Sequence, residues 1–457
     1  MATDTRTLSP LARPLTLAAM SLGYGVVQLD VTIVNTALGS IGGALGGGTA
    51  ALQWIVSTYT IAFAALILTA GALGDRVGAR RVFMAGFALF TAASLACSLA
   101  PTLSVLIAAR ALQGAGAALL VPNSLALLNH AYPDDRGRGR AVSIWAAGAS
   151  LALTAGPLAG GALSALAGWR SIFLVNLPIG LAGLWLTQRF AQETTRTARR
   201  ELDLAGQVLA VGALGCLAGA MIAGGVLGWT HHLVLGGFAV AALCAGLFLW
   251  QERRAAQPML PLELFRGRLF SLMSLAGLFV NIAFYGLIFV LSLYFQQVNQ
   301  LSPFATGLAF LPMMAAVLPL NLAAPRLAER IGAAAVIALG ACITAAGCLG
   351  LLFLARGTPY WALSVQLLAM GAGLGLLVPP LTSTLMGSVA KSRSGLAAAV
   401  LNATRQTGSV LGVALFGSLA AQGARFIPGA RASLLIAAAL LLGTALLTVT
   451  LGRTSRQ

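Results

Sequence analysis

Long apolar runs separated by short polar segments fill almost the whole chain. About twenty apolar residues cross the hydrocarbon core of a bilayer as a helix. Runs of that length recur along the sequence, and no polar segment between them is long enough to form a soluble domain. The pattern predicts an all-α membrane protein with fourteen transmembrane helices, near residues 15–38, 50–73, 82–100, 103–128, 141–166, 171–189, 204–228, 231–250, 269–297, 303–324, 332–354, 360–386, 395–420 and 432–451.

Two motifs occur twice at nearly the same spacing. The segment 114–122 (GAGAALLVP) returns at 371–379 (GAGLGLLVP), 257 residues later, and the segment 71–78 (GALGDRVG) is echoed at 325–332 (PRLAERIG), 254 residues later. Two related hydrophobic halves around a midplane site are typical of carriers. We therefore expect a cytoplasmic N-terminus (1–14), a six-helix half (15–190), a linker with an inserted helix pair (191–268), a second six-helix half (269–451) and a cytoplasmic C-terminus (452–457).

Composition narrows the class of protein. Charged residues make up 9% of the chain and hydrophobic ones 58%, against roughly 25% charged in a soluble domain. The net charge of +17 does not indicate nucleic-acid binding, because the arginines are scattered through the short gaps between apolar runs. With the N-terminus inside, 22 of the 28 Lys and Arg residues fall in inner segments, as the positive-inside bias predicts. This favours a multi-pass protein of a bacterial inner membrane with both termini in the cytoplasm.

The sequence gives no indication of enzyme chemistry. Its five cysteines lie in apolar runs without metal-ligand spacing, and its three histidines lie at the ends of spans. A membrane enzyme would need clustered His, Asp, Glu or Cys at membrane depth. We therefore expect a transporter rather than an enzyme, with no metal, no cofactor and no disulfide framework. A sensor or scaffold is disfavoured because no long soluble segment is present.

Five motifs occur in an order that resembles the major facilitator superfamily. They are 29–38 (LDVTIVNTAL), 71–81 (GALGDRVGARR), 110–116 (RALQGAG), 156–161 (GPLAGG) and 169–178 (WRSIFLVNLP). With fourteen spans, the chain resembles the drug:proton antiporter branch of multidrug-resistance efflux type. The resemblance implies export of drug- or antibiotic-like molecules in exchange for protons by alternating access. The chain departs from the family pattern at Gly39, Ala79 and Ala152.

Asp30 is the one carboxylate expected deep in the membrane. An ionised carboxylate in hydrocarbon costs several kcal/mol, so it must pair, face water or take up a proton. Arg110 in span 4 lies at matching depth, roughly 10–12 Å below the outer surface. Burial favours the neutral acid and a nearby guanidinium favours the carboxylate, so a conformational change can load or release a proton. The pair is either such a switch or a static contact between spans 1 and 4.

Arg405 lies about ten residues into span 13, and spans 9–14 contain no acid. It could bind an anionic group of a substrate, reach Asp30 across a central cavity, or bond backbone carbonyls freed by a helix kink. We expect a structural or coupling role rather than substrate binding.

Charged residues after spans 2 and 10 predict paired gates at the cytoplasmic side. They are Asp75, Arg76, Arg80, Arg81, Glu329 and Arg330. An acid there can accept hydrogen bonds from a helix N-terminus, and arginines can pair with acids and hold the inward gate shut. Gly71 and Gly78 would permit a tight turn. The alternative is a solvated basic loop that serves membrane topology alone.

Small residues recur along span 5 and predict close helix packing. The group contains Gly156, Gly160 and Gly161, and Pro157 removes a backbone hydrogen bond within it. Such faces let helices approach closely. We expect a hinge and a tight seal, or simple helix packing.

Polar and aromatic side chains within the spans are candidates for a central cavity. They are Gln28, Asn35, Trp54, Tyr59, Asn123, Asn281, Tyr285 and Arg405. With one deep acid committed to protons, a divalent cation is a poor substrate, and monovalent cationic, zwitterionic or neutral amphipathic compounds fit better. A narrow metabolite exporter and an uncoupled facilitator stay open as alternatives. The expected partners are the substrate, protons and membrane lipid, and we expect a monomer.

Overall fold

A computed structural model of the chain describes residues 11–195, 203–255, 258–260, 262–389, 394–420 and 425–454, and these residues contain helices and no strand. Residues 1–10 and 455–457 of the predicted termini and residues 196–202 of the predicted linker lie outside the described residues. The first helices are α1 (Ala12–Ile33), a 3₁₀ turn (Val34–Ala37), α2 (Leu38–Leu45), α3 (Thr49–Val77), α4 (Ala79–Leu99), α5 (Leu103–Ala131), α6 (Asp135–Ala167), α7 (Ser171–Leu174) and α8 (Asn176–Phe190).

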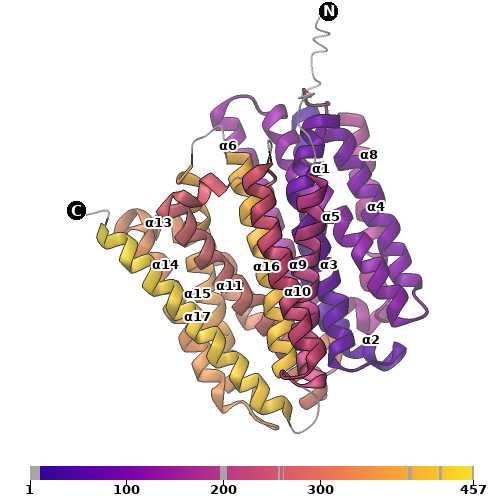
Figure 1. Cartoon of the computed structure of the whole chain (residues 1–457), viewed down its shortest axis with the longest axis vertical. Coiled ribbons are helices and arrows are strands. Elements are labelled where there is room, and N and C mark those ends of the chain that lie inside the picture. Colours follow the sequence, from indigo (N-terminus) through magenta and orange to yellow (C-terminus); the bar gives the residue numbers. More distant parts are fainter. Residues whose placement is uncertain are drawn as a thin grey trace, which may run out of the picture.

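The remaining helices follow the predicted spans along the rest of the chain (Figure 1). They are α9 (Leu204–Leu227), α10 (His232–Arg254), α11 (Arg268–Leu293) with a π-helical turn (Tyr294–Val298), α12 (Pro303–Ala309), α13 (Leu311–Ile331), α14 (Ala333–Gly350) with a 3₁₀ turn (Leu351–Phe353), α15 (Tyr360–Gly387), α16 (Ser394–Leu419) and α17 (Phe426–Thr454).

Thirteen helices in the described part of the chain are long and apolar enough to cross a membrane. They coincide with thirteen of the predicted spans. The predicted span at 395–420 is occupied by α16, which is 26 residues long and is not one of the thirteen. At 1.5 Å per residue α16 is about 39 Å long, which exceeds the roughly 30 Å hydrocarbon core of a bilayer.

Two helix boundaries differ from the sequence prediction. The predicted span 303–324 is divided at Phe310, and the membrane-length helix is Leu311–Ile331. The loop predicted after span 2 is also shorter than expected, because α3 continues to Val77 and holds Asp75 in its last turn. Gly71 is therefore helical and makes no turn. The turn itself is at Gly78 (φ +110°) and, in the echo, at Gly332 (φ +90°).

The sequence repeat has a counterpart in helix packing. The pairs α1 with α6, α3 with α5, and α4 with α5 are matched by α11 with α16, α13 with α15, and α14 with α15. A Cβ atom added to Gly116 would lie 2.7 Å from the amide nitrogen of Phe90. In the echo, a Cβ atom added to Gly373 would lie 2.6 Å from the amide nitrogen of Thr344. The repeated glycines therefore mark the same close helix crossing twice.

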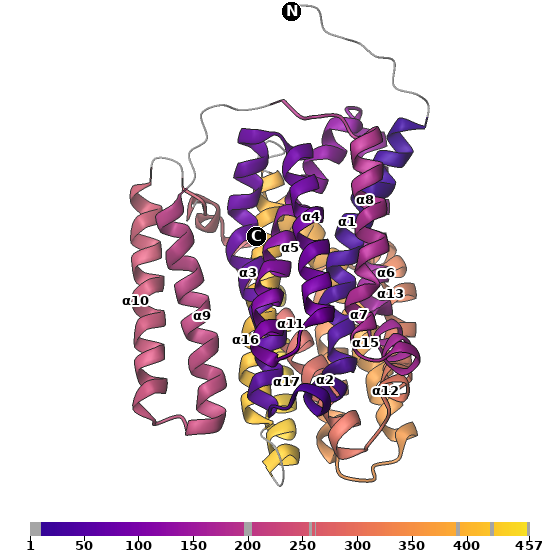
Figure 2. The ribbon, with the colours of Figure 1, turned by 90° about the vertical axis from the view of Figure 1, so that its right-hand side faces the viewer.

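The helix pair α9 and α10 stands at the side of the bundle (Figure 2). α9 packs against α3 and α16, and α10 packs against α9. Many large apolar side chains of α10 are exposed, among them Leu243 at 62% and Trp250 at 52%. These side chains suit contact with lipid rather than with a protein core.

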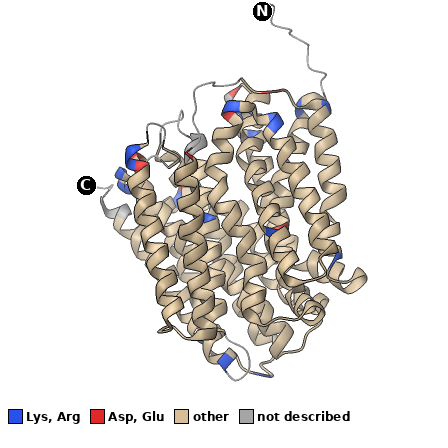
Figure 3. Ribbon diagram, turned by 45° about the vertical axis from the view of Figure 1, so that its right-hand side comes forward, with Lys and Arg blue, Asp and Glu red and all other residues tan. Residues whose placement is uncertain are grey.

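Charge separates the two ends of the bundle. Most Lys and Arg positions lie at the end where α1 begins, and few lie at the other end (Figure 3). We call the first the basic end, which contains the α3–α4 turn at Gly78, and the second the opposite end, which contains α2. The arrangement agrees with the asymmetry of arginines along the sequence.

The close crossing of α4 and α5 generates a stability prediction. Gly116→Ala places a methyl group against the backbone of Phe90, so it should lower the free energy of unfolding by ~1–3 kcal/mol. The thermal unfolding midpoint of the detergent-solubilised protein, followed by tryptophan fluorescence, measures the effect. The control is Gly236→Ala in α10, where a Cβ atom meets nothing within 4 Å. There alanine should leave the midpoint unchanged or raise it slightly. Equal midpoints for the two variants would contradict the tight crossing.

Candidate transport site

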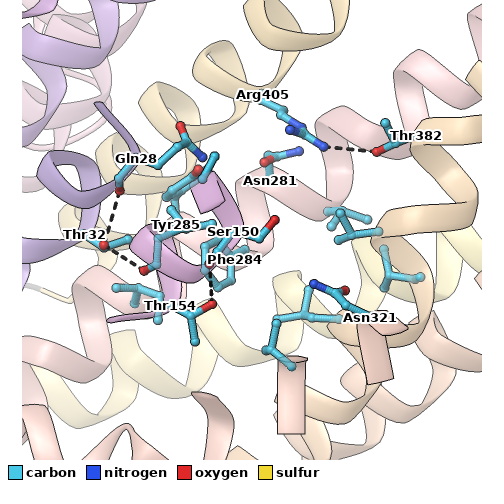
Figure 4. A pocket seen from close by; sticks show the side chains of 18 of the residues that line it. Gln28, Thr32, Ser150, Thr154, Asn281, Phe284, Tyr285, Asn321, Thr382 and Arg405 are labelled. Carbon is cyan, nitrogen blue, oxygen red and sulfur yellow. Dashed lines mark hydrogen bonds between the residues drawn. The ribbon is translucent and has the colours of Figure 1, made fainter. Parts of the chain in front are cut away.

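A cavity lies between the helices of the two repeated sets. Its walls come from α1, α6, α11, α13, α15 and α16. Polar side chains on the walls are labelled in Figure 4: Gln28, Thr32, Ser150, Thr154, Asn281, Tyr285, Asn321, Thr382 and Arg405. Apolar side chains line the rest, among them Phe284, Met313 and Leu377. The cavity therefore offers one amphipathic surface to a small molecule.

Four of the eight predicted cavity residues line this cavity: Gln28, Asn281, Tyr285 and Arg405. The other four point into protein contacts instead. Asn35 donates to the carbonyl of Val31 (3.2 Å), and Asn123 donates to that of Ala70 (3.1 Å). Trp54 packs against the apolar cluster between α3, α9 and α16, and the ring of Tyr59 covers Arg110. Asn35 and Asn123 thus satisfy their side-chain amides with backbone carbonyls, away from the cavity.

Six further polar cavity residues are absent from the sequence prediction: Tyr24, Thr32, Ser150, Thr154, Asn321 and Thr382. Ser150 and Thr154 are four residues apart on α6, so they share one helix face, and that spacing was a usable signal. The sequence contains no comparable signal for Thr32 and Thr382, because a threonine in a membrane helix commonly hydrogen-bonds to the backbone of its own helix.

Asp30 and Arg110 form a buried ion pair between α1 and α5, with exposures of 0% and 1%. The sequence predicted their common depth, and the structure brings the two groups into direct contact. The Arg110 Nε–H also donates to the carbonyl of Ile55 (3.2 Å), and the guanidinium lies 4.2 Å from the ring centroid of Tyr59. Neither member of the pair lines the cavity. Asp30 therefore lies outside the cavity wall, although its neighbours Gln28 and Thr32 on α1 belong to it.

Two amides complete the coordination of Asp30. Gln113 Nε2 donates to Asp30 Oδ1 (2.8 Å), while its own Oε1 accepts from Arg110 (2.7 Å). Asn176 Nδ2 donates to the same Asp30 oxygen (3.2 Å). Ser94 Oγ accepts from both amides, at 2.8 and 3.3 Å. We call Asp30, Arg110, Gln113, Asn176 and Ser94 the buried polar centre. Gln113 could have been predicted, because it lies three residues after Arg110 and so on the same helix face.

Arg405 faces the cavity from α16. Its guanidinium donates to Thr382 Oγ1 (3.1 Å) on α15, and the dashed line in Figure 4 marks this bond. It does not reach Asp30, whose oxygens are occupied within the buried polar centre. Arg405 is the one charged side chain among the described cavity residues.

The basic-end turn is held by the last turn of α8 and by the segment that follows it. Glu193 Oε1 accepts from the backbone N–H of Arg80 (2.9 Å), and the Arg80 guanidinium donates to the carbonyl of Gln188 (2.7 Å). Arg81 lies 3.8 Å from Glu193 and is 62% exposed. Asp75 and Arg76 lie in the last turn of α3, and Glu329 and Arg330 lie in the last turn of α13. The contacts of Arg80 and Arg81 therefore stay within the first set of helices.

The small residues of α6 pack against two different helices. Gly156 and Gly160 approach α1 at Thr32 and Ile33, so that an added Cβ atom would overlap them. Gly161 approaches α12, where a Cβ atom would lie 3.1 Å from Cα of Phe304. Pro157 lies inside the helix and lines the cavity.

At the opposite end, side-chain amides join the two repeated sets of helices. Gln296 Oε1 accepts from the Gly39 N–H (2.8 Å), and Gln296 Nε2 donates to the Asn35 carbonyl (3.2 Å). Gln53 Nε2 donates to the carbonyls of Val413 (3.0 Å) and Ala414 (2.9 Å). Because a Cβ atom at position 39 would overlap Gln296, the glycine that departs from the family pattern is needed for this contact.

The helical bundle, the internal repeat and the central cavity are those of a multi-pass membrane transport protein. The described residues contain no group of three His, Cys, Asp or Glu that could hold a metal ion. The chain belongs to the Major Facilitator Superfamily, whose family model matches residues 20–413 and, in a second match, residues 273–456.

Similar proteins include named resistance proteins. The chain is 38% identical to a methylenomycin A resistance protein of Streptomyces coelicolor, over 88% of this chain and 84% of that protein. It is 39% identical to the multidrug resistance protein Stp of Mycobacterium tuberculosis, over 89% of this chain and 76% of that protein. Among solved structures, a bacterial homologue of the human lysosomal transporter Spinster has a TM-score of 0.69 at 18% identity, covering 98% of both chains.

The buried polar centre generates a second stability prediction. Gln113→Met keeps the side-chain volume but removes a donor from Asp30 and an acceptor from Arg110. Leaving buried charged groups short of partners should lower the free energy of unfolding by ~1–3 kcal/mol. The matched control is Gln188→Met, whose side chain is exposed and should tolerate the change. Thermal unfolding midpoints of both variants in detergent measure the difference, and equal midpoints would show that Gln113 contributes nothing to the centre.

Proposed function

We propose that the protein is a secondary active exporter that moves amphipathic small molecules out of the cell in exchange for protons, by alternating access. The observation that carries this proposal is the pairing of two separate sites: an amphipathic cavity and a buried acid in its own polar centre. Family membership and the resistance proteins to which the chain is similar support export of drug- or antibiotic-like compounds. The cavity favours neither a broad range of substrates nor a single metabolite.

We propose fourteen transmembrane helices, with α16 as the fourteenth. In this arrangement residues 15–190 and 269–451 form two six-helix halves, and residues 191–268 contribute the linker and the inserted pair α9–α10. The repeated helix pairs and the repeated glycine crossings support the two halves. An even number of spans places both termini on one side. The collection of Lys and Arg at the basic end supports a cytoplasmic location for that side in a bacterial inner membrane. We expect the protein to act as a monomer.

We infer that the described conformation faces the cytoplasm. The amide bonds of Gln296 and Gln53 and the close contact of α6 with α12 all join the two halves at the opposite end. Opening that end requires these contacts to break while new ones form at the basic end. The proposed inner gate consists of the charged residues after spans 2 and 10: Asp75, Arg76, Arg80, Arg81, Glu329 and Arg330. In the sequence repeat, Glu329 and Arg330 on α13 correspond to Asp75 and Arg76 on α3. The close packing of α6 on α1 at Gly156 and Gly160 would serve as the hinge and seal.

Proton coupling follows from the balance of charge in the buried polar centre. The Asp30 side chain is held by Arg110 and two amide donors. In the proposed mechanism Arg110 separates from Asp30 when a proton binds, which demands a relative movement of α1 and α5. Gln28 and Thr32 of the cavity wall belong to α1, the helix that also carries Asp30. Substrate binding and protonation of Asp30 would therefore both shift the equilibrium of the same movement, that of α1 relative to α5.

The third prediction concerns Asp30→Asn, which should abolish compound-driven proton movement. The asparagine cannot exchange a proton, yet Arg110 keeps Gln113, the Ile55 carbonyl and the Tyr59 ring as partners, so the variant should fold and insert. Everted membrane vesicles with a fluorescent pH probe, given a panel of amphipathic compounds, measure proton release. The matched control is Asp134→Asn, because asparagine also caps a helix N-terminus and Asp134 caps α6.

Full proton release by Asp30→Asn would remove Asp30 from the mechanism and favour an uncoupled facilitator with the same fold. The exchanged pair, Asp30→Arg with Arg110→Asp, distinguishes the switch from a static contact. The switch requires the carboxylate among the donors of Gln113 and Asn176, so the exchanged pair should be inactive even where it folds. An active exchanged pair would favour a purely structural contact.

A further inference from the structure

We propose that Arg405 is an anion-binding subsite in the central cavity, and that the substrate is an amphipathic organic anion with one carboxylate or sulfonate group. The inference rests on the proposed export function and names its substrate class. It reverses the charge preference expected from the sequence, which favoured monovalent cationic, zwitterionic or neutral compounds.

The position of Arg405 places its charge within reach of a bound molecule. It lies eleven residues after the start of α16, about 16 Å along the helix. Its side chain is part of the cavity wall together with Asn281 and Tyr285 of α11. Gly408, three residues further along α16, packs so closely on α11 that a Cβ atom there would lie 2.7 Å from Cβ of Asn281. Arg405 and Asn281 therefore belong to one polar region of the wall.

The guanidinium of Arg405 has donor capacity that the protein leaves open. A guanidinium carries five N–H donors. In the described structure its hydrogen-bond acceptor is a single neutral hydroxyl, Thr382 Oγ1. The contrast with Arg110 is direct, because Arg110 has a carboxylate, an amide oxygen, a carbonyl and an aromatic face. A cation at membrane depth without a counter-charge is costly, so an anion that enters the cavity gains from pairing with it.

The remaining wall fits the rest of such a molecule. The Thr382 hydroxyl accepts from Arg405 and can donate its own hydrogen to the same anionic group. Phe284, Ile288, Met313 and Leu377 present an apolar surface beyond the polar region. A monovalent cation would meet an uncompensated positive charge in this cavity, since the described wall contains no acid.

The test is a binding comparison with three compounds that share one apolar body. They are 1-naphthylacetate, 1-naphthylacetamide and 1-naphthylmethylammonium, measured by isothermal titration calorimetry on the purified full chain at neutral pH without a proton gradient. The acetate should bind at least about tenfold more tightly than the ammonium compound, because charge-assisted hydrogen bonds replace charge repulsion. Equal or tighter binding of the ammonium compound, or no binding of any of the three, would overturn the proposal.

Two variants assign the preference to Arg405. Arg405→Gln should bind the acetate and the acetamide equally, while Arg405→Lys should keep a weakened preference for the acetate. The matched control is Arg431→Gln, since Arg431 bonds the carbonyl of Leu354 outside the cavity and should leave the preference unchanged. An unchanged preference in Arg405→Gln would also overturn the subsite. The wild-type comparison stands even where a variant fails to fold.

The binding assay separates this inference from the proposed antiport. Acetate binding through Arg405 together with no compound-driven proton movement in vesicles would keep the anion subsite and remove the antiport. Proton movement driven by the ammonium compound and lost in Asp30→Asn would keep the antiport and remove the anion subsite.

Discussion

The ion pair of Asp30 and Arg110 constrains the whole first set of helices. An ionised carboxylate and a guanidinium in a membrane interior are tolerated only with excellent geometry and further hydrogen bonds. Here α1 and α5 supply the pair, α4 supplies Ser94, and α8 supplies Asn176. The backbone of α3 supplies one more acceptor for Arg110. Five helices thus meet at one neutral polar centre, and none of them can shift alone without leaving a buried polar group short of a partner.

The second set of helices repeats the packing but not the buried ion pair. The close glycine crossing of α4 and α5 recurs between α14 and α15. The residue that the repeat makes equivalent to Arg110, however, is a leucine, Leu367. In the second set, the charged side chain that faces the cavity is Arg405. Two similar scaffolds thereby carry different chemistry: one holds a compensated pair away from the cavity, and the other presents an uncompensated cation to it.

Sequence patterns predicted the helices well because about twenty apolar residues, bounded by arginines, have few alternatives to a transmembrane helix. They also predicted that Asp30 and Arg110 lie at the same depth, since rise per residue converts sequence position into depth. They could not predict which way a polar side chain faces. Tyr59 contacts Arg110, while Tyr285 lines the cavity. Which side chain faces the cavity depends on how each helix is rotated about its axis. The sequence does not show this rotation, because these helices are apolar on every side.

The charge of the substrate decides how much energy the membrane potential contributes to export. Moving one elementary charge across a membrane potential of 100 mV changes the free energy by ~2.3 kcal/mol. A monovalent cation exported for one proton moves no net charge, so only the pH difference drives it. Under the proposed antiport, an anion bound at Arg405 and exported for one proton would move two charges in the favourable direction. Such an exporter would work against a steep gradient of its substrate even where the pH difference is small. The positions of the two arginines, one neutralised and one open to the cavity, would then determine the energetics of the transport cycle as well as substrate recognition.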